Sequence, residues 1–176
     1  MKHNFCYKLI GTLDTGLLND LKKMVLKSTY ESTPDFRADV INVKNLFFDE
    51  DAVLMEEFYK SLSRFFRYSG HIETNIARMS PNSYVSEHHD YSSITYGSVQ
   101  DIIVKLQIPI ITTNQVGMMW AGNSRYHPTV VNMIEGGIYI IDSIKLHSVV
   151  NLGSDYRYNL TSRWDVNSVI DPMLIV

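Results

Sequence analysis

His88 and Asp90 are separated by one residue, and their side chains could bind a metal ion together. In a β-strand, residues i and i+2 point to the same face, so an imidazole and a carboxylate would stand side by side. These groups are two of the three ligands in the 2-His-1-carboxylate triad, which holds non-haem Fe(II) and leaves coordination positions open. The third ligand should be a later histidine on a neighbouring strand, and His147 is the strongest candidate. If the strand is bulged, His89 could replace His88 as the ligand.

The order of the parts strengthens this interpretation, because a short His-x-Asp match occurs by chance in many proteins. After the match come a stretch rich in strand-like runs, the isolated His147 and, ten residues later, Arg157. The opposing interpretation is a non-catalytic interaction module in which His88 and Asp90 are structural residues. It predicts no bound metal.

The bulk properties of the chain predict one soluble domain. Its 176 residues are enough for a sizeable core, and apolar residues make up 45% and charged residues 20%. The net charge of −3 gives no electrostatic reason to expect nucleic acid or an anionic membrane as a partner. One cysteine, Cys6, excludes an internal disulfide and fits a reducing compartment. The N-terminus lacks the apolar core of a signal peptide, and no apolar run approaches the ~20 residues of a membrane span. We therefore expect a cytoplasmic enzyme or binding domain.

The first part of the chain is expected to support the site rather than to form it. Residues 5–10 predict a short strand, and Asp14 or Thr15 could cap a helix over residues 17–27. The apolar residues of that helix recur on one face. Another strand-like piece lies within residues 40–48.

A second helix should follow the acidic run 49–51, because negative charge suits the positive end of the helix dipole. Apolar residues then recur at helical spacing through Phe66, and Gly70 should end the helix. We expect the phenylalanines of this helix to be core residues rather than contacts to a cofactor. His71, directly after the glycine, should lie at the surface.

After residue 70 the pattern changes to short strand-like runs separated by turns. Many short strands at this spacing predict a sandwich or barrel, and helices before strands predict a jelly roll with helices on its outer face. No repeat, low-complexity tract or linker interrupts the chain. We therefore expect a single domain over residues 1–176, with 1–70 as N-terminal support and 71–166 as the jelly-roll core. The expected strands are residues 72–79, 83–87, 102–111, 117–121, 129–134, 137–142, 148–152 and 156–166.

Five pieces of the C-terminal part resemble, in the same order, the aspartyl/asparaginyl β-hydroxylase-like branch of the Fe(II)/2-oxoglutarate-dependent dioxygenases. The resemblance covers roughly residues 75–166 and says little about the N-terminal helices. It implies a double-stranded β-helix, which is the jelly-roll core of that superfamily. The five pieces are residues 78–90, 105–114, 134–142, 147–151 and 157–160.

The resemblance also implies a set of cofactors and a reaction. Fe(II) would be held by His88, Asp90 and His147, and 2-oxoglutarate and O₂ would take the remaining positions. Arg157 would pair with the distal carboxylate of 2-oxoglutarate, which suits a guanidinium because it is always charged and binds a carboxylate bidentately. The implied reaction hydroxylates an amino-acid side chain in a peptide or protein, or a related small molecule. Because the carboxylate ligand is present, no halide is expected in its place, which favours hydroxylation over halogenation.

Two residues depart from the family's pattern in the strand that helps to hold the co-substrate. Lys105 stands where the family often has Arg, and Gln107 stands where it often has His. An ammonium group can still pair with a carboxylate, and a carboxamide can still donate a hydrogen bond. We therefore expect Lys105 and Gln107 to contact 2-oxoglutarate.

Arg163 is the alternative to Arg157 as the carboxylate partner, because the two share strand parity. Asn159 and Thr161 share it as well, and polar residues on an inward face suit a hydrated co-substrate pocket. Arg157 is our choice. The opposite face should pack under the N-terminal helices, and it holds Tyr156, Tyr158, Leu160 and Trp164.

Several residues in connections are expected to lie at the mouth of the barrel, where aromatic side chains can hold a substrate. They could equally belong to a satellite core, and His127 could be a substrate contact or a plain loop residue. The other residues of this set are Tyr91, Tyr96, Trp120 and Arg125.

A third class of function stays open on the same architecture, namely a cupin-like metal protein that does not use 2-oxoglutarate. Cupin sites are usually richer in histidine and carry a His-x-His pair, which is absent from this sequence. Iron content together with 2-oxoglutarate-dependent release of succinate would separate the three interpretations.

Overall fold

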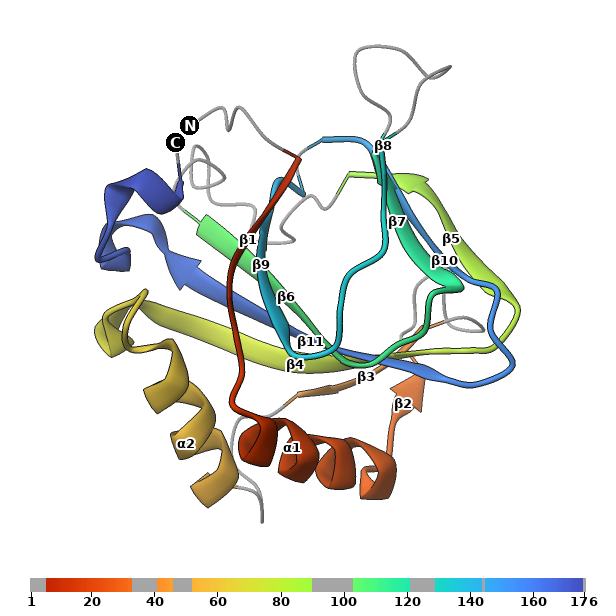
Figure 1. Ribbon diagram of the computed structural model, residues 1–176, viewed down its shortest axis with the longest axis horizontal. Helices are drawn as coiled ribbons and strands as arrows, with labels where there is room; N and C mark the ends of the chain where they lie inside the picture. Colours follow the sequence, from red (N-terminus) through yellow and green to blue (C-terminus); the bar gives the residue numbers. More distant parts are fainter. Residues whose placement is uncertain are drawn as a thin grey trace.

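The computed structural model contains two antiparallel sheets that face each other, with two helices packed against the larger sheet (Figure 1). Among the residues that the structure describes, no helix is long and apolar enough to cross a membrane. The described residues are 6–32, 41–45, 52–89, 103–120, 129–143 and 145–175.

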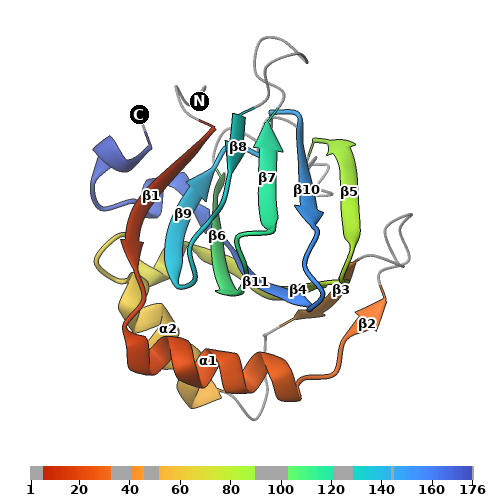
Figure 2. The same cartoon turned by 45° about the vertical axis from the view of Figure 1, so that its right-hand side comes forward.

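The strands that the structure describes after residue 70 are shared between the two sheets and form the expected jelly roll, and all but one pair of consecutive strands lie in different sheets. Both sheets join strands that are not consecutive in the chain, so residues far apart in sequence meet in the space between the sheets. In Figure 2 the strands of the smaller sheet lie side by side, in the order β5-β10-β7-β8. The larger sheet takes β4 (His71–Met79), β6 (Ile103–Ile111), β9 (Gly137–Ile141) and β11 (Arg157–Asp165). The smaller sheet takes β5 (Ser83–His88), β7 (Val116–Trp120), β8 (Thr129–Val131) and β10 (His147–Asn151).

The N-terminal part of the chain extends the larger sheet at both edges. β1 (Tyr7–Thr12) pairs antiparallel with β9 at one edge. β3 (Ile41–Asn45) pairs with β4 at the other edge, and the two-residue strand β2 (Glu31–Ser32) pairs with β3. The strands predicted near residues 5–10 and within 40–48 are therefore present as β1 and β3, and the structure adds that both belong to the larger sheet.

The first helix, α1 (Thr15–Lys27), is fixed at both ends by local hydrogen bonds. The Asp14 carboxylate accepts from the backbone N–H groups of Gly16 and Leu17, at 2.7 and 3.4 Å, which is the expected N-cap. At the other end the backbone N–H of Ser28 donates to the carbonyl of Met24. The apolar face packs into the core and consists of Leu17, Leu21, Met24 and Val25.

The second helix, α2 (Ala52–Leu62), ends earlier than predicted. The chain leaves the helix after Leu62, and Phe66 forms an isolated bridge with Val169 and stacks on Trp164 at 5.0 Å between ring centroids. Gly70 belongs to a separate 3₁₀ turn, Tyr68–Gly70, and does not end the helix. The prediction failed because contact with a distant residue of β11 decides where Phe66 lies. The acidic run 49–51 lies outside the described residues.

The core lies between the outer face of the larger sheet and the two helices. Alternate residues of β11 are buried there, namely Tyr158, Leu160 and Trp164, as predicted for this face. Tyr156 was predicted on the same face, but it precedes the strand and is exposed. Residues of β6 with the matching parity join them, including Leu106 and Ile108. Because side chains alternate along a strand, the intervening residues of β6 and β11 point into the space between the sheets.

Candidate active site

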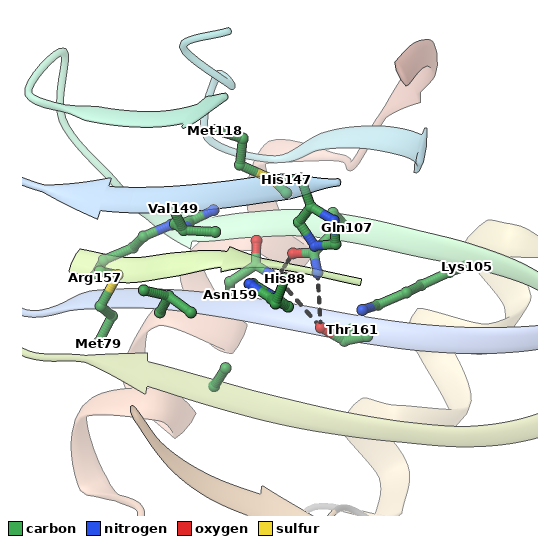
Figure 3. Close-up of a pocket in the computed structure, with 12 residues that line it drawn as sticks. Met79, His88, Lys105, Gln107, Met118, His147, Val149, Arg157, Asn159 and Thr161 are labelled. Carbon is green, nitrogen blue, oxygen red and sulfur yellow. Dashed lines mark hydrogen bonds between the residues drawn. The ribbon is translucent and has the colours of Figure 1, made fainter. Parts of the chain in front are cut away.

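A cavity of about 140 Å³ lies between the two sheets and is lined from both sides (Figure 3). The larger sheet contributes mainly polar side chains, and the smaller sheet contributes apolar side chains and two histidines. An engineered cavity of ~150 Å³ holds a benzene molecule, so the space suits a small organic ligand. The polar residues from the larger sheet are Lys105, Gln107, Arg157, Asn159 and Thr161. The smaller sheet provides Val85, His88, Met118, His147 and Val149.

His88 and His147 face each other across β5 and β10. They are a directly opposed cross-strand pair, and their ring centroids are 4.3 Å apart. In each ring Nδ1 lies within hydrogen-bond distance of the backbone carbonyl two residues earlier, at 2.7 Å from Ser86 O and 2.9 Å from Lys145 O. Because a carbonyl only accepts, Nδ1 must carry the proton in these bonds, which puts the lone pair of each neutral ring on Nε2. Metal-binding histidines commonly use this arrangement to fix the tautomer and the ring orientation.

A bulge in β5 decides which histidine reaches the cavity. From Val85 to His88 the chain advances three residues, whereas the paired segment of β10 from Val149 to His147 spans two, so β5 carries one extra residue. A bulge was expected to favour His89, but the observed bulge has the opposite effect, because in a regular strand His89 would share the face of Val85. In the structure His88 lines the cavity together with Val85.

The carboxylate of the expected triad cannot be placed, because Asp90 lies outside the described residues. Within the described residues, no group of three His, Cys, Asp or Glu side chains could hold a metal ion. The structure thus brings two of the three expected ligands together, and the role of Asp90 stays a prediction.

Arg157 lies in the same cavity with its side chain buried. It is 6% exposed, and its Nε has no hydrogen-bond partner among the described residues. Burial lowers the pKa of Arg157 to about 10, so the guanidinium is still charged at neutral pH. A buried charge without a counter-ion is strongly disfavoured, and a bound carboxylate would remove this penalty.

Arg163, the alternative carboxylate partner, is engaged elsewhere. Its Nη1 donates to the carboxylate of Glu73 on β4, to form a partly buried ion pair. Arg163 is directly opposite Lys105 in the β6–β11 register, and of these two residues Lys105 lines the cavity.

Three polar side chains between Arg157 and Lys105 are hydrogen-bonded to one another. Gln107 Nε2 donates to Thr161 Oγ1 at 3.2 Å, and Asn159 Nδ2 donates to Gln107 Oε1. Strand parity had placed Asn159 and Thr161 on this face. The bonds hold both carboxamides in fixed orientations at the cavity wall.

The apolar side of the cavity was not predicted as part of the site. Met79 from β4 and Met118 from β7 line it together with Val85 and Val149. The signal available in the sequence was parity, since Val149 lies two residues after His147. Met118 has no comparable local signal, because only the pairing of β7 with β10 brings it there.

The remaining sequence candidates contribute little to the described site. Trp120 lies in β7 opposite His147 in the backbone register. His71 is half-buried rather than at the surface, with its ring 4.5 Å from that of Tyr59 and 5.1 Å from that of Trp164. Four expected rim residues lie outside the described residues, namely Tyr91, Tyr96, Arg125 and His127.

No protein-family model matches the sequence, and no curated protein matches it either. The structure is nevertheless similar over almost its whole length to solved structures of low sequence identity. One is an oxidoreductase of the 2OG-Fe(II) oxygenase family from Burkholderia pseudomallei, with 14% identity and a TM-score of 0.64. The match covers 93% of this chain and 86% of that chain.

Two further neighbours were solved with the co-substrate bound. The viral collagen prolyl hydroxylase from Paramecium bursaria Chlorella virus-1, in its 2OG complex, has 13% identity and a TM-score of 0.60, and the match covers 92% of this chain and 96% of that one. HygX from Streptomyces hygroscopicus, with nickel and 2-oxoglutarate bound, has 11% identity and a TM-score of 0.64. The match covers 91% of this chain and 82% of that chain. At these identities the likeness establishes the jelly-roll fold.

Proposed function

We propose that this chain is an Fe(II)/2-oxoglutarate-dependent dioxygenase that hydroxylates an amino-acid side chain in a peptide or protein, or a related small molecule. Within the superfamily we assign it to the aspartyl/asparaginyl β-hydroxylase-like branch, on the five matching sequence pieces. The whole chain acts as a single domain in this proposal. The single cysteine fits work in the reducing cytoplasm.

The observation that carries the proposal is the pairing of two kinds of group in one small cavity. Two histidines present Nε2 lone pairs, and a buried arginine presents hydrogen-bond donors without an acidic partner in the described residues. A metal site alone would not need the arginine, and a carboxylate site alone would not need the paired imidazoles. A metal-chelating acid with a second carboxylate uses both, and 2-oxoglutarate is such an acid.

We assign the metal site to His88, Asp90 and His147. The donor set fits Fe(II), since imidazole and carboxylate are the ligands of the non-haem iron triad. Bonds from Nδ1 to Ser86 O and Lys145 O would keep both rings from turning when the metal binds. When bound, Fe(II) with 2-oxoglutarate and O₂ supplies the oxidising chemistry that breaks an unactivated C–H bond.

We assign the co-substrate site to Arg157, Lys105 and Gln107. Arg157 would bind the distal carboxylate, where its buried charge gains a partner. Lys105 and Gln107 come from β6 and line the cavity, so they can hold other oxygens of the same ligand. The apolar wall on the smaller sheet excludes water, which strengthens each of these polar contacts.

The decisive experiment is a titration of 2-oxoglutarate into the Fe(II)-loaded protein without oxygen, followed by visible absorbance. A metal-to-ligand charge-transfer band that saturates with 2-oxoglutarate is expected, and admission of O₂ should then release succinate. Metal binding with no such band would favour a cupin-like metal protein, and absence of metal binding would favour a non-catalytic module. Candidate peptides and free amino acids, scored by stimulated succinate release, would then identify the substrate.

A further inference from the structure

Two buried polar atoms on β11 lack hydrogen-bond partners within the described part of the chain, and they are complementary. Nε of Arg157 is a donor and Oδ1 of Asn159 is an acceptor. The two side chains are 6% and 3% exposed. Residues i and i+2 of a strand point to the same face, and both residues line the cavity. A buried donor and a buried acceptor without partners are rare in folded proteins and are expected to find one.

The orientation of the Asn159 carboxamide is fixed by its own neighbours. Nδ2 donates to the carbonyl of Leu160 at 3.0 Å and to Oε1 of Gln107, and it lies 3.5 Å from Oγ1 of Thr161. A turned carboxamide would place Oδ1 against these acceptors. Oδ1 must therefore point the other way, and in Figure 3 it is turned away from Thr161.

Arg157 has two sides on which it can bind a carboxylate. One side uses Nε and one Nη, and the other uses both Nη groups. An acceptor that occupies Nε leaves the second side for the ligand. Arg157 is the more adaptable partner, since its long side chain carries more rotatable bonds than that of Asn159.

We propose that Asn159 is a positioning residue for Arg157. When a carboxylate enters the cavity, Nε–H of Arg157 donates to Oδ1 of Asn159, and this bond turns both Nη groups toward the carboxylate. The inference rests on the proposed function, because it takes the distal carboxylate of 2-oxoglutarate as the ligand. Gln107 takes part indirectly, since it holds the carboxamide of Asn159 in place.

The test measures 2-oxoglutarate affinity by calorimetry on the Mn(II)-loaded protein, without oxygen, in a double-mutant cycle. Asn159→Ala should weaken 2-oxoglutarate binding by about 5- to 30-fold, the effect of one lost hydrogen bond to a charged group, with Mn(II) affinity unchanged. In the Arg157→Ala background the same change should weaken binding by less than about twofold, because the two residues act as a unit. Asn159→Leu, which keeps the shape without polar atoms, repeats the test if the alanine variant folds poorly.

A second probe separates positioning from direct contact. 2-Oxobutyrate has the metal-chelating end of 2-oxoglutarate but no distal carboxylate, so Asn159→Ala should not change its affinity. Asn75→Ala is the matched control. Asn75 lies on β4, directly opposite Thr161 of β11, and does not line the cavity. The Asn75→Ala variant should therefore bind 2-oxoglutarate with unchanged affinity.

Two results would overturn the inference. If wild-type protein binds 2-oxoglutarate but the two substitutions are additive, Asn159 does not act through Arg157, and the proposed function stands. If metal-loaded wild-type protein does not bind 2-oxoglutarate at all, the proposed function and this inference fall together.

Discussion

His88 and His147 form a directly opposed pair between β5 and β10 because β5 carries one extra residue between Val85 and His88. In a regular strand Val85 would share its face with Glu87. The bulge instead turns His88 toward the cavity, where its ring lies 4.3 Å from that of His147. Bulges next to active sites commonly redirect a side chain in this way.

The first prediction concerns the metal. His147→Ala should lower the affinity for Fe(II) or Mn(II) by more than about 100-fold, since loss of a partner outside the coordination shell alone costs 10- to 100-fold. The melting temperature should fall by only a few degrees, because strand pairing does not depend on the imidazole. Metal titration and thermal unfolding measure the two effects. His89→Ala is the control and should bind metal as the wild type does; the reverse result would move the ligand to His89.

The second prediction concerns Arg157. Arg157→Ala should weaken 2-oxoglutarate binding by between ~30-fold and several thousand-fold, which corresponds to roughly 2–5 kcal/mol for one partner of a buried charge pair. Arg157→Lys should recover part of this, because an ammonium cannot form the bidentate fork. The anaerobic charge-transfer titration gives each constant.

Arg163→Ala is the matched control for Arg157, as it removes the same group from the same face of β11. Its guanidinium is paired with Glu73, so the effect on 2-oxoglutarate binding should be much smaller. Normal binding in Arg157→Ala with lost binding in Arg163→Ala would transfer the role to Arg163.

The third prediction concerns pH and His71. Burial lowers the pKa of His71, with a smaller opposing effect from Glu73. The folded state then binds fewer protons at this site than the unfolded state, so stability should fall as the pH drops below the ordinary histidine pKa of ~6.5. His71→Gln should flatten the fall in melting temperature between about pH 6.5 and 5 relative to the wild type. Parallel curves for the two proteins would show that His71 does not contribute.

The fourth prediction concerns Gly70. A Cβ at this position would lie 2.1 Å from Cβ of Ser168, so Gly70→Ala should destabilise the fold by about 1–3 kcal/mol through overpacking. Ser168→Gly in the same chain should relieve part of the loss. Gly117→Ala is the control, since its new Cβ would meet no atom of the described structure closer than 3.5 Å. Urea unfolding measures all three variants, and equal stability of the two alanine variants would contradict the packing argument.

The sequence by itself determined the features that depend on local periodicity. The alternation along β11 put Arg157, Asn159 and Thr161 on one face and Tyr158, Leu160 and Trp164 on the other, because side chains of a strand alternate. The N-cap at Asp14 followed from a carboxylate beside the first turn of α1. The jelly roll followed from many short strands after two helices.

The tertiary structure decided what depends on distant partners. The bulge in β5 turns His88 rather than His89 toward the cavity. Arg163 is paired with Glu73 and does not line the cavity. Phe66 stacks on Trp164 and lies outside the second helix. Each of these outcomes depends on which strand lies beside which and in what register. Such pairings join residues up to about a hundred positions apart, and no local pattern in the chain encodes the register between them.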